Sequence, residues 1–200
     1  MRTLAAVAAI AVATAARAGD PGYGKPEGVL PHAVLGPKVM LVSFPAPGFG
    51  VEAKALNLVG VSFDYGFIPD VSVSGVSVGL TSWSLAARVY PFRGAFCAGV
   101  ALGSREFHGS KTDASTGTPV KAKATVTSTF VAPEIGWRWV WSSGLFLGMD
   151  LGWQFVLSDR ATLEANGASV GTQQDVQDQA DRIGKAGLPV LGLLQLGWFF

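Results

Sequence analysis

Residues 188–200 read LPVLGLLQLGWFF, an apolar segment that stops at the C-terminal Phe200. Leu194, Leu196 and Trp198 occupy alternate positions before it, which is the spacing of one face of a β-strand. In a soluble protein, an unpaired apolar edge strand of this kind invites aggregation. In a closed membrane barrel, the same strand pairs on both sides and its apolar face lies against lipid. The segment therefore favours a membrane β-barrel.

The same segment resembles the C-terminal assembly signal of bacterial outer-membrane β-barrels, with Phe200 as the terminal aromatic residue. In its general pattern, the chain looks like the broad family of small outer-membrane barrel proteins, although specific residues match only at the C-terminus. The resemblance implies two partners, which are outer-membrane lipid and the barrel-assembly machinery that engages the terminal strand.

The beginning of the chain has the pattern of a secretory signal peptide. Arg2 precedes an apolar run at residues 4–15, and an Ala-Arg-Ala sequence ends at Ala18. A helix of about 12 residues rises only about 18 Å, too little for a hydrocarbon core of roughly 30 Å, which disfavours a membrane anchor. We expect export to the bacterial outer membrane after cleavage near Ala18. The predicted divisions are a signal peptide at 1–18, an N-terminal arm at 19–35 and a barrel at 36–200.

The composition is apolar although no apolar helix is present. Hydrophobic residues make up 49% of the chain and charged residues 14%, against about 25% charged in typical soluble domains. No run of 18 apolar residues follows the signal peptide, so a transmembrane helix is not expected. Cleavage would remove two of the 15 basic residues and none of the 14 acidic ones. This near-neutral balance argues against nucleic acid as a partner.

Period-two alternation runs through the rest of the chain and predicts β-strands. In residues 144–158, one face carries large apolar side chains such as Leu147 and Leu151, and the other carries Gly148 and Asp150. Similar segments lie near residues 38–44, 50–56, 59–67, 83–89, 96–105 and 121–141, and the terminal strand makes eight. The predicted fold is all-β: an eight-stranded antiparallel transmembrane β-barrel with one short helix in a long loop.

A soluble β-sandwich would also have one apolar face, so the other face decides between the two folds. Here that face is mostly Gly, Ala and Ser with an occasional charge, which suits the crowded lumen of an eight-stranded barrel. Buried charges persist only when they are paired. We therefore predict a structural salt-bridge network in the lumen, with a transport path or active site as the alternative. The predicted members are Glu52, Lys54, Asp64, Arg88, Arg105, Glu134, Arg138 and Asp150.

Aromatic residues are predicted to form girdles at the two membrane interfaces. The candidates are Trp137, Trp139, Trp141, Trp153, Trp198 and Phe200, together with Tyr90, Phe92 and Phe199.

Short and long connections alternate, which sets the expected orientation because periplasmic turns are short in such barrels. The short turns lie at residues 56–58, 91–94 and 142–143, and the longer loops at 68–75, 109–120 and 159–187. In the last loop, Val176, Ala180 and Ile183 recur at helical spacing, and we expect a short amphipathic helix at 172–186.

The sequence offers little that could carry catalysis. The His108-Gly109-Ser110 segment is similar to the His-x-Ser pair of outer-membrane lipid A deacylases, but an acid that could orient the imidazole is not evident. Two distant histidines and the single Cys97 predict neither a zinc site nor a disulfide, and no cofactor motif is present. We expect no enzyme, no metal and no cofactor. The predicted role is structural or in surface interaction. The alternative is a narrow pore or a carrier of lipid or small molecules, and a lipid A-modifying hydrolase is a remote one.

Overall fold

The structure is a computed structural model that describes residues 33–73, 76–113, 120–165 and 187–200. Alternating apolar segments pair as antiparallel strands throughout this part of the chain. The strands are β1 (Ala33–Phe44), β2 (Gly48–Ala55), β3 (Val59–Val73), β4 (Val76–Val89), β5 (Phe96–Asp113), β6 (Val120–Val140), β7 (Leu145–Trp153), β8 (Phe155–Ala165) and β9 (Pro189–Trp198).

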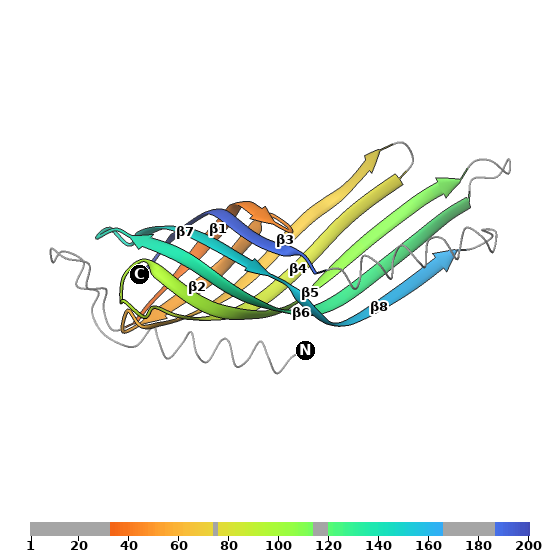
Figure 1. Cartoon of the computed structure of the whole chain (residues 1–200). Helices are drawn as coiled ribbons and strands as arrows, with labels where there is room; N and C mark the ends of the chain where they lie inside the picture. Colours follow the sequence, from red (N-terminus) through yellow and green to blue (C-terminus); the bar gives the residue numbers. More distant parts are fainter. Residues whose placement is uncertain (1–32, 74–75, 114–119, 166–186) are drawn as a thin grey trace.

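These segments close into one barrel (Figure 1). Each strand pairs with the next from β1 to β6, β7 pairs with both β6 and β9, and β9 returns to β1. Because β7 and β8 follow each other along β6, the barrel has eight strands, as the sequence predicts. The alternative of a two-sheet sandwich is wrong, since the ladder runs continuously around the barrel.

The break between β7 and β8 has a local cause. Glu134 pairs with Gly152, and Val131 pairs with Phe155, so the register is the same on both sides of the break. Pro133 lies between these pairs and has no N–H to donate to the ladder. On the other side of the strand, the N–H of Gln154 donates to the Leu188 carbonyl, 2.7 Å away. The predicted single strand at 144–158 is therefore divided only in its hydrogen bonding.

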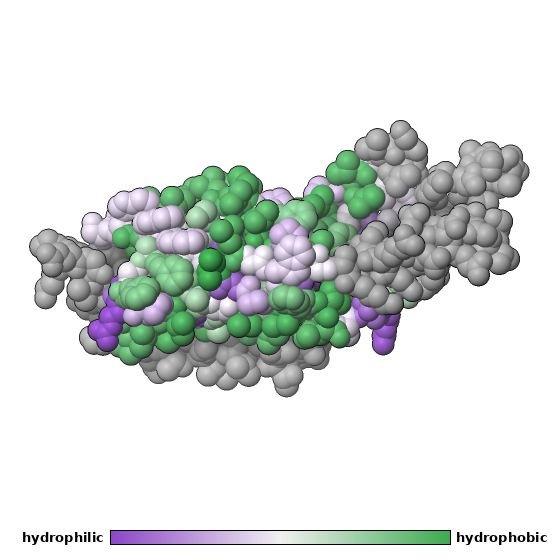
Figure 2. Space-filling view, viewed as in Figure 1, coloured by the Kyte–Doolittle hydropathy of each residue, from purple (hydrophilic) through white to green (hydrophobic). Residues whose placement is uncertain are grey.

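The pleat sorts apolar side chains to the outside of the barrel and polar ones to the inside. Phe63, Leu85 and Leu102 are exposed, whereas their sequence neighbours Ser62 and Ala86 are buried. In Figure 2 the apolar colour covers much of the visible wall of the described strands. An apolar exterior of this kind matches an acyl-chain environment rather than water. Among the described residues, no helix is long and apolar enough to cross a membrane.

The two ends of the barrel differ in height. Three tight turns lie at the end that holds the C-terminus, and Leu56 and Asn57 in the first of them have φ values of 55° and 51°. At the other end, the β3–β4 and β5–β6 hairpins and β8 rise well beyond the β1–β2 hairpin and β9 (Figure 1).

Where the structure describes the predicted long loops, most of their residues are strand. β3 and β4 continue through residues 68–73 and 76, and β5 continues to Asp113 before β6 begins at Val120. β8 likewise extends to Ala165, inside the loop predicted at 159–187. Polar stretches pair here as readily as apolar ones because the ladder is formed by backbone groups, which do not require an apolar face. The predicted helix at 172–186 and the predicted signal peptide at 1–18 lie outside the described residues.

The first and last strands close the barrel at the short-turn end. The N–H of Phe200 donates to the Leu35 carbonyl at 2.9 Å, and Phe199 donates to the Gly144 carbonyl at 2.8 Å. β1 begins at Ala33, so residues 33–35 belong to the barrel rather than to the predicted N-terminal arm. The apolar Val34 explains this earlier start, because it packs inside the barrel against Phe199.

The final two aromatic residues point in opposite directions. Phe199 is 0% exposed and stacks on Phe146 with 4.5 Å between ring centroids, whereas Phe200 is 67% exposed. Phe199 and the fully buried Tyr90 are therefore not girdle residues, and that part of the sequence prediction is wrong. Both occupy inward positions of the pleat, where they fill the end of the lumen.

We predict that Phe199→Ala lowers the free energy of unfolding by about 3 to 5 kcal/mol, because it removes a buried ring and leaves a cavity. The matched control is Phe200→Ala, which removes an exposed ring and should cost no more than about 1 kcal/mol. Urea unfolding of the folded protein in detergent micelles measures both. Equal costs for the two variants would contradict the observed orientation of the terminal strand.

Candidate functional site in the barrel lumen

The most distinctive interior feature is a cluster of charged side chains at mid-height. The inward positions of β2, β4, β6 and β7 supply Glu52, Arg88, Arg138 and Asp150, and all four are buried. Strands that are distant in sequence meet here because a narrow barrel places opposite walls within side-chain reach. The cluster therefore depends on closure of the barrel.

Arg138 forms the centre of this cluster. Its Nε lies 3.1 Å from Glu52 Oε2, and its Nη2 lies 2.7 Å from Asp150 Oδ2. A second bond from Nη1 to Asp150 Oδ1, at 2.9 Å, makes the pairing with Asp150 bidentate. Arg138 Nη1 also donates to the carbonyls of Trp137 and Met149. The guanidinium, 1% exposed, is thus compensated by two carboxylates and two backbone oxygens.

Arg88 extends the cluster to the adjacent walls. Its Nη2 lies 2.7 Å from Glu134 Oε1 and 3.3 Å from Asp150 Oδ2, and its Nη1 donates to Ser62 Oγ at 2.7 Å. Gln195 from β9 completes the surroundings of Asp150 by donating to Oδ2 at 2.7 Å. A single carboxylate, Asp150, therefore connects two arginines and the terminal strand.

Lys38 is a member of the cluster that the sequence prediction missed. Its Nζ lies 3.3 Å from Glu52 Oε2 and 2.9 Å from Asp64 Oδ1. Val39 and Leu41 beside it are exposed, so alternation along β1 could have assigned Lys38 to the lumen. The strand is predicted to begin at Lys38. Because no earlier residue of the strand is assigned, the alternation before Lys38 is not used to place its side chain.

Two predicted members lie inside the barrel but at its margins. Lys54 Nζ stands 4.0 Å from the centroid of the Tyr90 ring, and the Tyr90 hydroxyl donates to Glu52 at 3.2 Å. Arg105 donates to Gln154 Oε1 at 2.7 Å, above the central cluster. Seven described residues are thus connected by ion pairs within 4.0 Å: Lys38, Glu52, Asp64, Arg88, Glu134, Arg138 and Asp150.

Glycines make the space for these side chains. A Cβ atom at Gly136 would lie 2.2 Å from Asp150 Oδ1, and one at Gly148 would lie 3.0 Å from Arg138 Nη1. Any larger residue at Gly136 would therefore displace the Asp150 carboxylate. The glycine-rich inner face is a steric requirement of the ion pairs.

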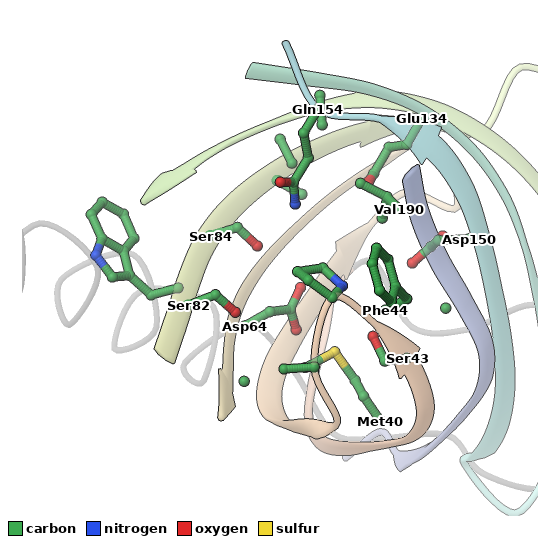
Figure 3. Close-up of a pocket in the computed structure, with 18 of the residues that line it drawn as sticks. Met40, Ser43, Phe44, Asp64, Ser82, Ser84, Glu134, Asp150, Gln154 and Val190 are labelled. Atoms are coloured by element: carbon green, nitrogen blue, oxygen red, sulfur yellow. The ribbon is translucent and has the colours of Figure 1, made fainter. Parts of the chain in front are cut away.

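A small cavity borders the cluster on the side of the tall hairpins. Its volume is about 70 Å³, and Figure 3 shows Asp64, Glu134 and Asp150 around it with Phe44 and Val190. This space is far below the roughly 300 to 1,000 Å³ of ordinary ligand pockets. The lumen at this level is filled mainly by side chains.

The predicted girdle tryptophans face outward, but they do not form a single band. Trp139 and Trp141 lie by the β6–β7 turn, and Trp198 pairs with Leu145 at the same end. Trp153, eight residues further along β7, lies about 27 Å along the strand from Leu145 and so away from the turns. The remaining two candidates are the half-buried Trp137 and the exposed Phe200.

A second group of aromatic residues lies away from the turns, and the sequence prediction did not assign it. Tyr65 pairs with Trp83, and its ring lies 5.5 Å from Phe49 and 6.4 Å from Phe67. With a strand tilt of roughly 40°, the separation of about 27 Å along β7 between Leu145 and Trp153 corresponds to about 21 Å of height across the barrel wall. That height is close to the roughly 25 Å apolar band of outer-membrane barrels.

The surface histidine has acidic neighbours on both sides. His108 Nε2 lies 3.1 Å from Asp70 Oδ1, and Nδ1 lies 3.9 Å from Glu106 Oε1. Asp70 comes from β3 and reaches His108 over Gly79 of β4, a contact that sequence order does not reveal. Since both ring nitrogens face carboxylates, this arrangement differs from a base directed at Ser110. Within the described ranges, no group of three His, Cys, Asp or Glu residues could hold a metal ion.

Comparisons with known proteins find that this chain is similar to solved structures. No family model and no curated protein sequence matches the chain. The crystal structure of Acinetobacter baumannii CarO2 is 14% identical, with a TM-score of 0.45, over 84% of this chain and 98% of that one. The structure of Acinetobacter baumannii CarO is 16% identical, with a TM-score of 0.45, over 84% of this chain and 96% of that one.

We predict that Arg138→Gln lowers the free energy of unfolding by about 3 to 5 kcal/mol, because it leaves Glu52 and Asp150 buried without their main counter-charge. Adding Asp150→Asn to that variant should recover part of the loss. Exposed Lys123→Gln is the matched control and should change stability by about 0.5 kcal/mol or less. Urea unfolding in micelles measures all three. A neutral Arg138→Gln would show that the ion pairs do not support the fold.

Proposed function

We propose that this barrel resides in the bacterial outer membrane after cleavage near Ala18 and has a structural or surface-interaction role, with a closed lumen. The apolar exterior and the ring closure support the location, because a spanning sheet in lipid must leave no edge unpaired. The terminal strand is proposed to engage the barrel-assembly machinery. Its outward Phe200 and its pairing to β1 fit that role.

The observation that carries the proposed closed lumen is the continuity of the ion pairs across it. The connected residues come from β1, β2, β3, β4, β6 and β7, so they extend around much of the inner wall. A solute would have to separate buried pairs such as Arg138–Asp150 to pass. Breaking such a pair leaves uncompensated buried charge at a cost of several kcal/mol.

The tall end supports the surface-interaction part of the proposal. With short turns on the periplasmic side, the β3–β4 and β5–β6 hairpins and β8 project outward from the cell (Figure 1). The outer face of their upper portions carries polar residues, including Thr127 and Arg160, rather than the apolar residues found lower on the wall. These strands therefore offer a rigid polar surface above the membrane.

A narrow pore or a carrier of lipid or small molecules is the second candidate function. The cavity beside Asp64 and Glu134 favours it, because polar groups line space inside the lumen. Its volume of about 70 Å³ accommodates little more than a few water molecules. A lipid A hydrolase is less well supported, because His108 faces Asp70 and Glu106 through both nitrogens.

We predict that the purified protein gives no discrete conductance steps in planar bilayers. The charge-balanced variant Arg88→Ser/Glu134→Ser removes two long side chains that meet at 2.7 Å, and it should introduce small steps. Arg160→Gln, at an exposed site on β8, is the matched control and should stay silent. Stepwise conductance of the unaltered protein would reject the closed lumen in favour of the pore.

Expression in cells provides the test of the enzymatic alternative. We expect the mass spectrum of extracted lipid A to be the same with and without the protein. A mass loss equal to one acyl chain, abolished by His108→Ala, would instead establish the hydrolase.

A further inference from the structure

A second, larger hollow lies at the short-turn end of the barrel. β5 makes its last ladder pair at Phe96 with Trp137, and the Arg138 N–H then donates to the Ala95 carbonyl at 2.8 Å. β6 continues to Val140, beyond its last contact with β5, and turns into β7. The wall is therefore notched between the β4–β5 turn and the lower edge of β6. A cavity of about 430 Å³ occupies this notch.

The charges around the notch are all of one sign. Lys54, Arg93 and Arg138 line it, and no carboxylate is among its described lining residues. The central cluster, by contrast, contains four carboxylates. Arg93 is exposed in the turn, so at least one of these cations is available to a ligand from outside. Arg138 is already paired with Glu52 and Asp150, so Lys54 and Arg93 are the cations that give the notch the electrostatic character of an anion site.

Lys54 provides an independent indication of an anion site. Its side chain is buried, with 5% exposure, and Nζ lies 4.0 Å from the centroid of the Tyr90 ring. No carboxylate of the described residues lies within 4.0 Å of this ammonium group. Glu52 acts on this ammonium group only from beyond ion-pair distance, so an anion in the adjacent cavity would give it a direct partner.

The remaining lining residues indicate an anion that carries an apolar tail. Trp139 and Trp141 border the cavity and are exposed on the lipid side of β6. Leu147 pairs with Trp139 on the same outer face. Indole rings of this kind lie at the level of lipid headgroups, with apolar neighbours toward the acyl chains. A small anion without an apolar tail would make no favourable contact with this apolar side of the notch.

We propose that the notch binds the headgroup of an anionic phospholipid of the periplasmic leaflet. The phosphate lies between Arg93 and Lys54, and the acyl chains lie along Trp139 and Leu147 on the barrel exterior. This inference rests on the proposed membrane location and orientation. The headgroup phosphate has the same chemistry as inorganic phosphate. The test therefore includes inorganic phosphate for comparison.

The test is native mass spectrometry of the protein folded in detergent micelles, titrated with phosphatidylglycerol or with phosphatidylcholine of the same chains. We expect phosphatidylglycerol to bind about tenfold more tightly. Each cation removed should weaken its binding about fivefold, so Arg93→Asn/Lys54→Gln should lose roughly 25-fold. Arg160→Gln, at the opposite end, is the control and should bind as the unaltered protein does.

Three outcomes would overturn the inference: equal binding of the two lipids, a double variant that keeps the preference, or inorganic phosphate that binds as tightly as phosphatidylglycerol. If the double variant does not fold, Arg93→Asn alone decides, because Asn tolerates the positive φ of 52° at this exposed turn. Heat-dependent gel migration of the same samples reports folding separately. A folded barrel without lipid preference rejects this site only, whereas a protein released without detergent rejects the membrane location as well.

Discussion

The requirement that the sheet leave no edge strand unpaired governs this structure. It is met only when the last strand returns to the first, and the bonds between Phe200 and Leu35 complete that closure. Closure fixes the width of the lumen, and an eight-stranded barrel leaves room for side chains alone. The alternation of large apolar and small polar residues then has one consistent solution, in which the large residues face outward.

A narrow lumen imposes its own electrostatic requirement. Charged groups drawn from six strands are confined to a space without bulk water, so each must lie against an opposite charge or a hydrogen-bond partner. Arg138 and Asp150 meet this requirement most completely, and Gly136 and Gly148 supply the space. Ion pairs across the lumen also connect opposite walls. The interior therefore contributes to the shape of the barrel as well as filling it.

Alternation allowed much of the fold to be predicted, because a period of two repeats in every strand and requires no knowledge of partners. It also assigned Glu52, Arg88 and Arg138 correctly to the inside. It failed where the pattern is short or absent. Lys38 stands at the predicted start of its strand, and the extensions above the wall are rich in Ser, Thr, Gly and charged residues, which favoured loops. Asp70 reaches His108 across an intervening strand, which no spacing in the sequence encodes.

The sequence by itself determined the architecture: one face of each strand is apolar, the other is small or charged, and the count of strands follows from the turns. Only the tertiary structure decided which charges meet, which terminal aromatic residue is buried, and where the wall is tall or notched. The physical reason is that alternation is a local property of each strand. Ion-pair partners, packing of Phe199 on Phe146 and strand ends depend instead on the register between strands, which is set only when the barrel closes.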